Sequence, residues 1–474
     1  MPIIGIMSYI RYKQFGNKQY AYEVTAYWDK EAKKPRQRVK YLGVVDEQGN
    51  LVTREVSRRE ERLILDFGDT YLLSEFMKKQ ELGGLLADVF GDATPKLLSL
   101  LCYRLCQDAA MRYAALWQEG NIAHVLYKAV NLSSQRVSEL LRVIGNETLQ
   151  RAFFTRYLPS FSHGTEGIII DTTALPNQIG LPFNAWGYHD GSIDKQIRFL
   201  LVIDRGTALP LFFRYLAGNI VDVASLHTTM EELGHLGVGK STVILDAGFF
   251  SEDNVKDLYE SRIDFLTRLP SNRTAYKELI RKEAHTLERF DHVVRYGKRA
   301  LFVKQKRVTL FGRRIYAHIV LDPERKGRET KRLLLDALEG HDAEIEYTLK
   351  KQGIMILVSS FPVDRKEIVP LYYLRQTAET LFGFSKDDLK LIPLRVHTEE
   401  TLRGYLFLIF LALTVFLRLR KEIGDTYTVD EALLIMRNLK CKVFEQEILV
   451  QELTKRQREI VERLGIIVPK KMGI

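Results

Sequence analysis

The chain has 474 residues, 46% of them hydrophobic, which is long enough for two or more folded modules with a substantial core. Its net charge of +10 is compatible with a polyanionic partner but does not require one. Three cysteines are too few for a disulfide framework or for a zinc site with four cysteine ligands. Residues 1–10 lack the basic start, apolar core and cleavage site of a signal peptide, so we expect a cytoplasmic protein.

The first part of the chain predicts a small β module, which we place at residues 1–56. Polar and apolar side chains alternate through residues 20–28 and 38–45, and a polar turn that contains a proline separates these two runs. Five of the eight residues 33–40 are Lys or Arg. This cluster is either a binding surface for an anion or an ordinary solvated face.

Residues 57–163 predict a helical domain. Apolar residues recur at spacings of three and four through residues 97–110 and again through residues 137–144, which is the pattern of helices with one buried face. Cys102 and Cys106 lie four residues apart in the first of these runs, so we expect both thiols to pack in a core.

Beyond residue 163 the chain predicts a mixed α/β domain whose sheet is buried on both faces. Four strongly apolar runs are interleaved with a helical pattern at residues 226–236. The four runs are residues 167–170, 199–203, 211–215 and 243–245. A fifth apolar run, residues 353–358, follows much later in the chain. We therefore assign residues 164–268 and 352–422 to one domain.

Residues 269–351, between the two parts of this domain, predict a basic β-rich insertion. Short alternating stretches at residues 293–303 and 308–320 are typical of strands. Residues 268–314 hold fourteen Lys or Arg and four acids, a surplus of ten that equals the net charge of the whole chain. The candidate contacts to a polyanion are Arg295, Lys298, Arg299, Lys304, Lys306 and Arg307.

The last part of the chain, residues 423–474, predicts a C-terminal helical region. Just before it, residues 405–417 form the most apolar stretch of the sequence. This stretch is shorter than the roughly 20 residues that a membrane-spanning helix needs. We therefore expect a buried helix there and no contact with a membrane.

Two aspartates follow apolar runs directly. Asp171 comes after residues 168–170, and Asp246 comes after residues 243–245, so we expect each acid at the C-terminal end of a buried strand. Open sheets place their ligand sites at this edge. A single aspartate in such a position is often only a turn or helix cap.

A third acid, Glu379, lies among other polar residues at helical spacing. At about 100° per residue, spacings of three, four and seven residues place Tyr372, Arg375, Glu379 and Lys386 on one face of a helix. A phenol, a guanidinium, a carboxylate and an ammonium make a poor core face. An i,i+4 ion pair between Arg375 and Glu379 would explain two of the four residues.

These four residues resemble the signature of bacterial insertion-sequence transposases of the DDE type, in the broad insertion-sequence-4-like group. The third acid of that family lies in the motif Y-x-x-R-x-x-x-E-x-x-x-x-x-x-K, and the chain matches all four positions. Further matches are Gly167-Ile168-Ile169-Ile170-Asp171-Thr172-Thr173, Ala217-Gly218-Asn219 and Asp246-Ala247-Gly248-Phe249. The resemblance covers roughly residues 167–417. It implies an RNase H-like catalytic core in which Asp171, Asp246 and Glu379 form the DDE triad.

The resemblance also implies an activity, cofactors and partners. A DNA transposase of this kind cleaves the ends of an insertion sequence with water and then uses the liberated 3′-hydroxyl to attack target DNA. The triad would hold two divalent ions, Mg²⁺ or Mn²⁺, for both steps. Tyr372, Arg375 and Lys386 would hold the end phosphates, Arg375 by forked contacts and Lys386 as a point charge. The partners would be double-stranded DNA and a second copy of the chain, as a homodimer.

Two alternatives stay open at the level of sequence. The first is a domesticated relative that binds DNA without cutting it, and the second is an RNase H-like nuclease that lacks strand transfer. The intact triad argues against the first, and the long flanking domains argue against the second. We expect recognition of the DNA ends before the core. Residues 133–141 have the polar, arginine-bearing start of a recognition helix, although we favour an ordinary capped surface helix.

Overall fold

The computed structural model describes residues 8–15, 18–29, 33–45, 51–52, 63–128, 130–161, 167–189, 192–219, 222–238, 242–338 and 345–473. The chain forms two compact units, Met1–Arg62 and Leu63–Ile474. The predicted module boundaries at residues 56 and 163 lie outside the described residues.

The N-terminal unit is an antiparallel sheet with the strand order β1-β2-β3-β4. Its strands are β1 (Ser8–Phe15), β2 (Lys18–Asp29), β3 (Lys34–Val45) and β4 (Leu51–Val52). The two predicted strands are confirmed as β2 and β3, whereas β1 was not predicted. Ala21 and Val24 are fully buried, while Tyr9, Trp28 and Tyr41 are about half exposed. The unit therefore has a small apolar centre and exposes aromatic rings among its cations.

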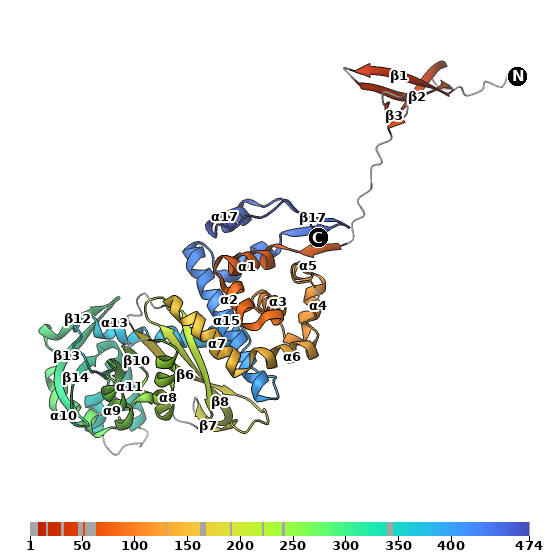
Figure 1. Cartoon of the computed structure of the whole chain (residues 1–474). Helices are drawn as coiled ribbons and strands as arrows, with labels where there is room; N and C mark the ends of the chain where they lie inside the picture. The colour runs from red at the N-terminus through yellow and green to blue at the C-terminus, as the bar shows by residue number, and fades with distance from the viewer. Residues whose placement is uncertain are drawn as a thin grey trace. The chain divides into compact units, whose positions relative to one another are not determined.

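The second unit is built around a ten-stranded mixed sheet (Figure 1) with the order β12-β13-β14-β15-β11-β10-β6-β8-β7, in which β9 also pairs with β8. Strands β6, β10 and β11 run parallel to one another, and β8 and β15 are antiparallel to them. The core strands are β6 (Ile168–Pro176), β7 (Ala185–His189), β8 (Ser192–Asp204), β9 (Pro210–Ala217), β10 (Val243–Leu245), β11 (Phe265–Arg268) and β15 (Ile354–Ser359). The predicted mixed α/β fold is confirmed.

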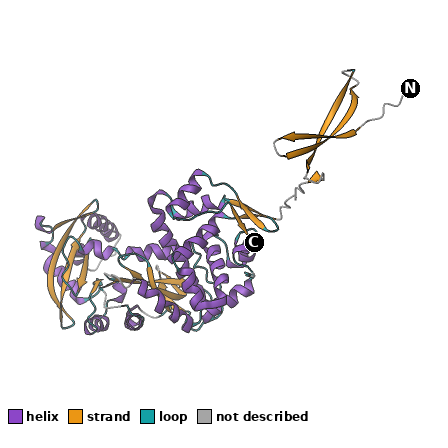
Figure 2. Ribbon diagram, turned by 45° about the horizontal axis from the view of Figure 1, so that its top comes forward, coloured by secondary structure: helices purple, strands orange, loops and turns teal. Residues whose placement is uncertain are grey.

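Helices pack against the central strands of this sheet (Figure 2). The consequence is visible in β8, where every residue from Phe199 to Asp204 is buried instead of every second one. The covering helices include α8 (Asp222–His235), α9 (Glu252–Glu260), α13 (Ile368–Tyr373) and α14 (Gln376–Asp387). The side chain of Ser251 caps α9 by accepting a hydrogen bond from the amide of Asn254.

The strands of the predicted insertion extend the core sheet and do not form a sheet of their own. β14 pairs with β15, which pairs with β11 of the core. The two predicted strands, residues 293–303 and 308–320, are three strands in the structure. The chain turns at Gly297 and Gly312, which adopt positive φ values of 59° and 75°. The elements are α10 (Thr274–Glu283), β12 (Val293–Tyr296), β13 (Arg299–Leu310), β14 (Arg313–Leu321), α11 (Pro323–Leu338) and α12 (Ile345–Lys351).

The predicted helical domain is confirmed for most of its length. Its helices are α1 (Gly68–Lys79), α2 (Leu82–Phe90), α3 (Thr94–Cys106), α4 (Ala114–Glu119), α5 (Ala123–Leu126), α6 (Ser134–Ile144) and α7 (Glu147–Tyr157). Cys102 and Cys106 are buried and free, as expected for core thiols. The candidate recognition stretch, residues 133–141, lies in α6, whose Val137, Leu140 and Leu141 are buried.

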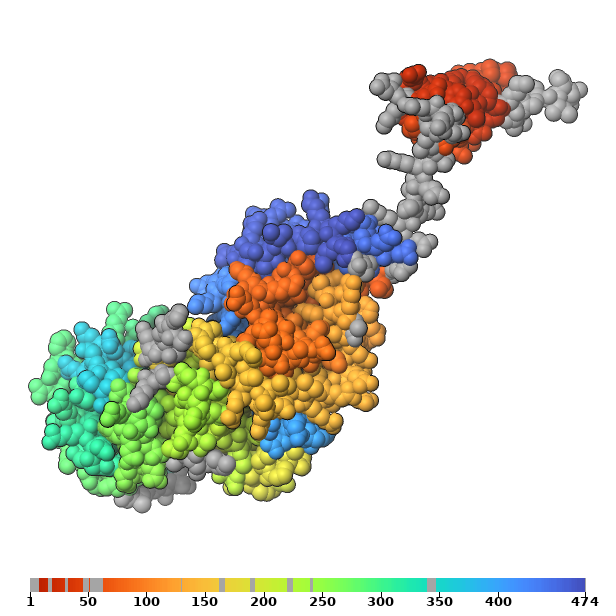
Figure 3. Space-filling model, viewed as in Figure 1, coloured from red at the N-terminus to blue at the C-terminus, as the bar shows by residue number. Residues whose placement is uncertain are grey.

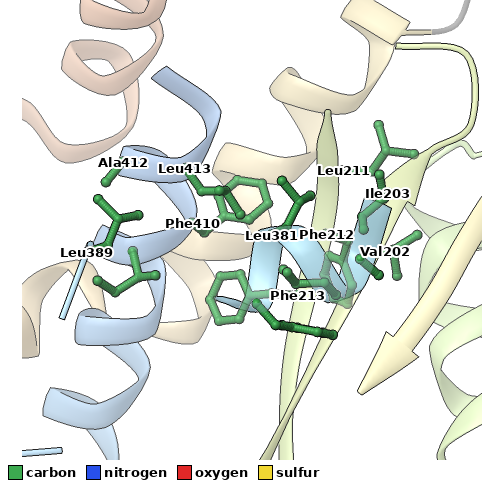
Figure 4. Packing of buried hydrophobic residues seen from close by; sticks show 14 of the residues in the cluster. Val202, Ile203, Leu211, Phe212, Phe213, Leu381, Leu389, Phe410, Ala412 and Leu413 are labelled. Atoms are coloured by element: carbon green, nitrogen blue, oxygen red, sulfur yellow. The ribbon is translucent and has the colours of Figure 1, made fainter. Parts of the chain in front are cut away.

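These helices pack around α15 (Glu399–Ile423), the predicted buried helix. The helix is longer than expected, and by length and composition it could cross a membrane, but 78% of its most apolar window is buried inside the protein. Its side chains reach the sheet: the ring of Phe410 lies 5.6 Å from Phe213 of β9 (Figure 4). Each such buried Phe contributes roughly 1.5–3 kcal/mol. The helical domain and the sheet therefore share one core.

The C-terminal region is not wholly helical, so that prediction is wrong. Besides α16 (Val429–Arg437) and α17 (Lys455–Arg463), it contains β16 (Lys440–Val443), β17 (Glu447–Val450) and β18 (Lys471–Gly473). These strands form a sheet with β5 (Leu63–Asp66), which lies in the predicted helical domain. The physical reason is a long-range pairing: Cys441 and Val443 bury their side chains where β16 pairs with β5. Figure 3 shows this blue C-terminal segment lying against the orange helices.

Candidate active site

Asp171 and Asp246 lie side by side on neighbouring strands. β6 and β10 run parallel, and their last pair in register is Ile170 with Leu245, so both aspartates come directly after that pair. Asp246 follows the end of β10, as predicted. Asp171 does not end its strand, because β6 continues to Pro176 alongside the long antiparallel strand β8. That part of the prediction is wrong, yet the two carboxylates meet where β10 ends.

Glu379 comes from α14, which packs against β6. The buried side chains of α14 include Ala378, Leu381 and Phe382. The ring of Phe382 lies 6.2 Å from the ring of Phe199 in β8, so this helix is held on the face of the sheet. Glu379 lies on its first turn with an exposed side chain.

The helix that carries the four motif residues is interrupted. Between α13 and α14 the backbone makes i→i+3 hydrogen bonds: the amide of Arg375 donates to the carbonyl of Tyr372, and the amide of Ala378 donates to that of Arg375. Such a turn has about three residues instead of 3.6. The prediction of one regular helix face for all four residues is therefore wrong. Arg375 and Glu379 still touch, at 2.6 Å, and Lys386 lies in the last turn of α14.

The guanidinium of Arg375 connects all three acids. Its Nη1 lies 2.9 Å from Oδ2 of Asp171, its Nη2 lies 2.6 Å from Oε1 of Glu379, and its Nε lies 3.5 Å from Oδ1 of Asp246. The last contact is an ion pair without a hydrogen bond, since Nε is buried and has no acceptor. The side chains of Arg375 and Asp171 are 18% and 8% exposed, whereas that of Glu379 is 55% exposed.

Three carboxylates share this single guanidinium. Burial and these neighbouring charges together set the pKa of Asp171. Burial raises the pKa of Asp171 to about 7, and the negative charge of Asp246 adds to the rise. Arg375 and the amide of Thr172, which donates at 2.8 Å, offset only part of it. Burial alone would lower the pKa of Arg375, but Asp246 and Asp171 together raise it above its ordinary value. The cluster is thus short of positive charge.

The donor set of this cluster is all oxygen, which is the set that Mg²⁺ and Mn²⁺ prefer. Within the described ranges, no three His, Cys, Asp or Glu side chains lie close enough together to share one ion. In this arrangement Arg375 lies among the three acids and contacts each of them. The residues therefore fit such ions in chemistry, and a shift of the guanidinium would be needed for the carboxylates to close on one.

Comparison with known protein families assigns the chain to one of them. The sequence profile of the family described as "Transposase DDE domain" matches residues 162–415, more than half of the chain. The chain belongs to this family. It is a DDE-type DNA transposase, and the alternative of a relative without catalysis is not favoured.

Comparisons with individual proteins add little to this assignment. A solved structure of a piggyBac transposase synaptic complex with hairpin DNA is similar at 12% identity and a TM-score of 0.42. The match covers 84% of this chain and 79% of that one. No curated protein matches the transposase in sequence.

Two threonines support the aspartates of the transposase: Thr172 belongs to a motif matched in the sequence, whereas Thr267 was not singled out there. The amide of Thr172 donates to Asp171, as described above, and the hydroxyl of Thr267 donates to the carbonyl oxygen of Asp246 at 3.1 Å. Thr267 is buried and pairs with Leu245 across β10 and β11. The only signal in the sequence was one polar residue inside an apolar strand, which alone does not point to a partner.

Tyr372, predicted to contact DNA, is almost fully buried beside the acids. Its burial and the negative charge of Asp246 raise the pKa of Tyr372 to about 12, so the phenol stays protonated at neutral pH. The guanidinium of Arg375 lies 5.9 Å from the centre of its ring. Tyr372 can therefore act as a hydrogen-bond donor near the acids, but not as a charge.

The six cations predicted to contact DNA do not share one surface of the transposase. Lys304 and Lys306 both pair with Glu283 of α10, at 2.6 and 3.4 Å, and Lys304 is only 17% exposed. Arg299 lies on the other face of β13 and pairs with Asp322 at 3.0 Å. The remaining three, Arg295, Lys298 and Arg307, are exposed. Half of the predicted set is therefore tied into the fold by ion pairs.

Proposed function

We propose that this transposase belongs to the insertion-sequence group with the Y-R-E-K motif, and that it cleaves the ends of such an element and joins them to target DNA. One observation carries the proposal. A single guanidinium, that of Arg375, contacts Asp171, Asp246 and Glu379, which come from two strands and a helix. Acids from three separate elements converge on one point, as a catalytic triad requires.

In this proposal Asp171, Asp246 and Glu379 hold two divalent ions, Mg²⁺ or Mn²⁺. The shortage of positive charge in the cluster supports this assignment, since three carboxylates share one guanidinium. Bound ions would activate the attacking water and stabilise the leaving oxygen. The same residues can serve strand transfer, because there the nucleophile is a 3′-hydroxyl and the rest of the site is unchanged.

Arg375, Tyr372 and Lys386 would bind phosphates of the DNA end. Arg375 is suited to this role because a planar guanidinium makes two parallel hydrogen bonds to a phosphate as readily as to a carboxylate. Tyr372 would add a neutral donor. Lys386 lies seven residues after Glu379, or about 10 Å along a helix, so it would reach a different phosphate. Arg375 would then exchange its carboxylate contacts for phosphate contacts when DNA binds.

Recognition of the DNA ends would lie outside this core. The N-terminal unit supports that placement, because its sheet carries cations beside exposed rings: Arg11 lies 5.6 Å from the ring centre of Tyr9. Rings and guanidinium groups suit contacts to bases and phosphates. A second copy of the transposase would be needed to hold two ends together, so we also propose a homodimer on DNA. The proposed site of action is the bacterial cytoplasm.

The test is metal-dependent cleavage of a duplex that carries the end of the element. Asp171→Asn, Asp246→Asn and Glu379→Gln should each abolish cleavage in Mg²⁺ or Mn²⁺ and leave DNA binding largely intact. Asp257→Asn is a matched control, because this carboxylate lies on α9 with an exposed side chain and contacts His227, away from Arg375. Near-wild-type cleavage by any one of the three variants would remove that residue from the triad.

A further inference from the structure

A pocket of about 430 Å³ lies in the helical part of the transposase, away from the three acids. It is enclosed by the end of α3 and the residues after it, by the start of α6, and by the segment that leads from α14 into α15. In Figure 3 a blue patch lies against orange atoms of the helical domain. Four cations line the pocket: Arg104, Arg112, Lys390 and Arg395.

Arg104 is the unusual member, because it is a buried cation that forms no ion pair with any residue that the structure describes. It is 2% exposed, and its Nη2 donates to two backbone carbonyls, those of Gln107 and Ala109. Its Nε is buried and has no hydrogen-bond partner among the described residues. Burial accordingly lowers the pKa of Arg104. A buried charge is normally paired, since removing it from water costs several kcal/mol. An anion in the pocket would supply the missing partner.

The surroundings of Arg104 add further positive charge. Among the described residues, Asp108 is the one acid that lines the pocket, and it pairs with Lys390 at 2.7 Å. Arg112 and Arg395 form no ion pair in the described part of the chain. The net charge of the lining is therefore strongly positive.

The start of α6 also faces the pocket, through Ser134 and Ser138. The side chain of Ser133, the N-cap of this eleven-residue helix, makes no capping hydrogen bond. The first amides of a helix carry partial positive charge and bind anions. The arginine-bearing stretch that resembled a recognition helix thus buries its apolar face on α15 and turns its polar start to this pocket.

We propose that this pocket binds a phosphate group of a DNA strand. The proposal rests on the DNA-binding role proposed above and gives it a second anchoring point, separate from the acids. The volume lies within the roughly 300–1,000 Å³ of ligand pockets and exceeds what a bare phosphate needs. Apolar side chains line the rest of it, including Val137, Leu141 and Val396, and these suit a deoxyribose or the edge of a base.

The position of the pocket fits a strand that also reaches the active site. Lys390 follows the end of α14, the helix that carries Glu379, so one short stretch of chain joins the two sites. Tyr405 of α15 donates a hydrogen bond to the carbonyl of Lys390 and fixes the loop at this point. A phosphate held here would therefore be positioned relative to the acids by a helix, not by a loop alone.

The experiment measures binding of the full-length protein to a duplex in EDTA, where no cleavage occurs. Fluorescence anisotropy at several NaCl concentrations compares wild type with Arg112→Gln/Arg395→Gln. The control is Arg456→Gln/Arg458→Gln, which removes two exposed arginines from α17. The pocket variant should bind about tenfold more weakly, and the log–log salt slope should fall by about 0.9 for each lost contact. The control should change both quantities much less.

A second variant, Arg104→Met, tests the buried charge itself. It should weaken DNA binding to the same degree. Its thermal midpoint without DNA is measured alongside, because the removal of a buried charge stabilises the fold whereas the carbonyls of Gln107 and Ala109 lose their donor. Inorganic phosphate and dAMP serve as small probes in thermal shift and calorimetry. Weaker binding of the duplex by the pocket variant than by the control supports the proposal.

Other outcomes overturn it. Unchanged duplex binding by the pocket variant means that no DNA phosphate binds there, and this conclusion holds even if Arg104→Met fails to fold. Loss of dAMP or phosphate binding with unchanged duplex binding assigns the pocket to a free nucleotide instead. Neither result touches the triad, because cleavage by the Asp171, Asp246 and Glu379 variants is measured separately.

Discussion

The contact of Arg375 with the three acids predicts that Arg375→Gln lowers the stability of the protein in EDTA and raises its affinity for Mn²⁺. Arg375→Gln removes the only cation that the cluster contacts in the described structure. Breaking a buried ion pair typically costs about 3–5 kcal/mol. Glu379 and Asp246 are 55% and 37% exposed on their side chains, so water screens part of this, and we expect a loss of about 2 kcal/mol in EDTA.

Divalent ions should reverse that loss. In the wild-type protein the guanidinium must leave the carboxylates before they can close on an ion, whereas in Arg375→Gln the site is already free of it. If about 2 kcal/mol is released in this way, Mn²⁺ should bind roughly tenfold or more tightly to the variant. Cleavage should nevertheless fall, because the contact of Arg375 with the DNA phosphate is lost. Tighter metal binding with slower cleavage is the distinctive combination.

The assay is a thermal unfolding scan in EDTA and in a series of MnCl₂ concentrations, followed by cleavage of an end-containing duplex. Arg403→Gln is a matched control, since this arginine is 13% exposed and pairs with Glu147 and Glu399 at 3.0 Å in the helical domain. It should lose stability equally with and without Mn²⁺. The reasoning about Arg375 is refuted if its variant behaves like this control, with the same loss in both conditions and unchanged affinity for Mn²⁺.

Three further predictions concern other parts of the chain. Burial lowers the pKa of His318 to about 4, so the neutral ring stabilises the fold above pH 6.5 and this contribution, about 3 kcal/mol, is lost as the pH falls through 4. His318→Leu should therefore flatten the pH dependence of stability between pH 6.5 and 4, and a profile as steep as that of wild type would contradict this. Lys298→Gln/Arg307→Gln should lower the log–log salt slope of DNA binding by up to about 1.8. Lys304→Gln should change the stability of the protein and leave this slope unchanged. Equal slopes for the two variants would show that the basic segment is only a solvated face. Gly404→Ala should lower the free energy of unfolding, measured in urea, by about 1–3 kcal/mol, because the new methyl would lie 1.9 Å from a backbone oxygen of α6. A value within error of wild type would show that α6 can move away at little cost.

Much of the fold could be predicted because its signals are local. The apolar runs that became β6, β8 and β10 are buried on both faces, and their composition alone states this. The lengths of the strands were not local. Asp171 lies inside β6 and not at its end because β8, some thirty residues later, is long enough to keep pairing with it. A strand ends where its partner ends, and no property of Asp171 or its neighbours reports that.

The C-terminal sheet shows the same limit on a larger scale. β16 pairs with β5 across most of the chain, with Lys440 opposite Asp66. Four alternating residues, 440–443, are too short a pattern to outweigh the helical signals on either side of them. This segment is a strand because it pairs with β17 on one side and with the distant β5 on the other, and β5 is itself only four residues long.

The basic segment illustrates why a count of charges is a weak guide to a binding surface. Its surplus of ten predicted contact with the DNA backbone, but β13 directs its side chains alternately to two faces, and cations on each face meet an acid of the chain. Lys304 faces Glu283 of α10, while Arg299 faces Asp322 on the opposite side. The strand alternation was readable from sequence, whereas the acids that meet each cation come from elements up to about twenty residues away.

Two arginines indicate functional sites, and of their contacts the sequence offered only the ion pair of Arg375 with Glu379. Arg375 has three carboxylates and a raised pKa, so its charge is held in place and can be exchanged for that of divalent ions. Arg104 pairs with no carboxylate in the described ranges, and burial lowers its pKa, so its charge would be stabilised by an anion from outside the chain. The same side chain therefore indicates a site in two opposite ways. Where an arginine has more carboxylates around it than its own charge can neutralise, a metal cation is expected to replace it. Where an arginine has no carboxylate to neutralise it, an anion is expected to bind beside it. In a DNA transposase one substrate and its ions meet both requirements, since divalent cations accompany the phosphate chain that the enzyme cuts.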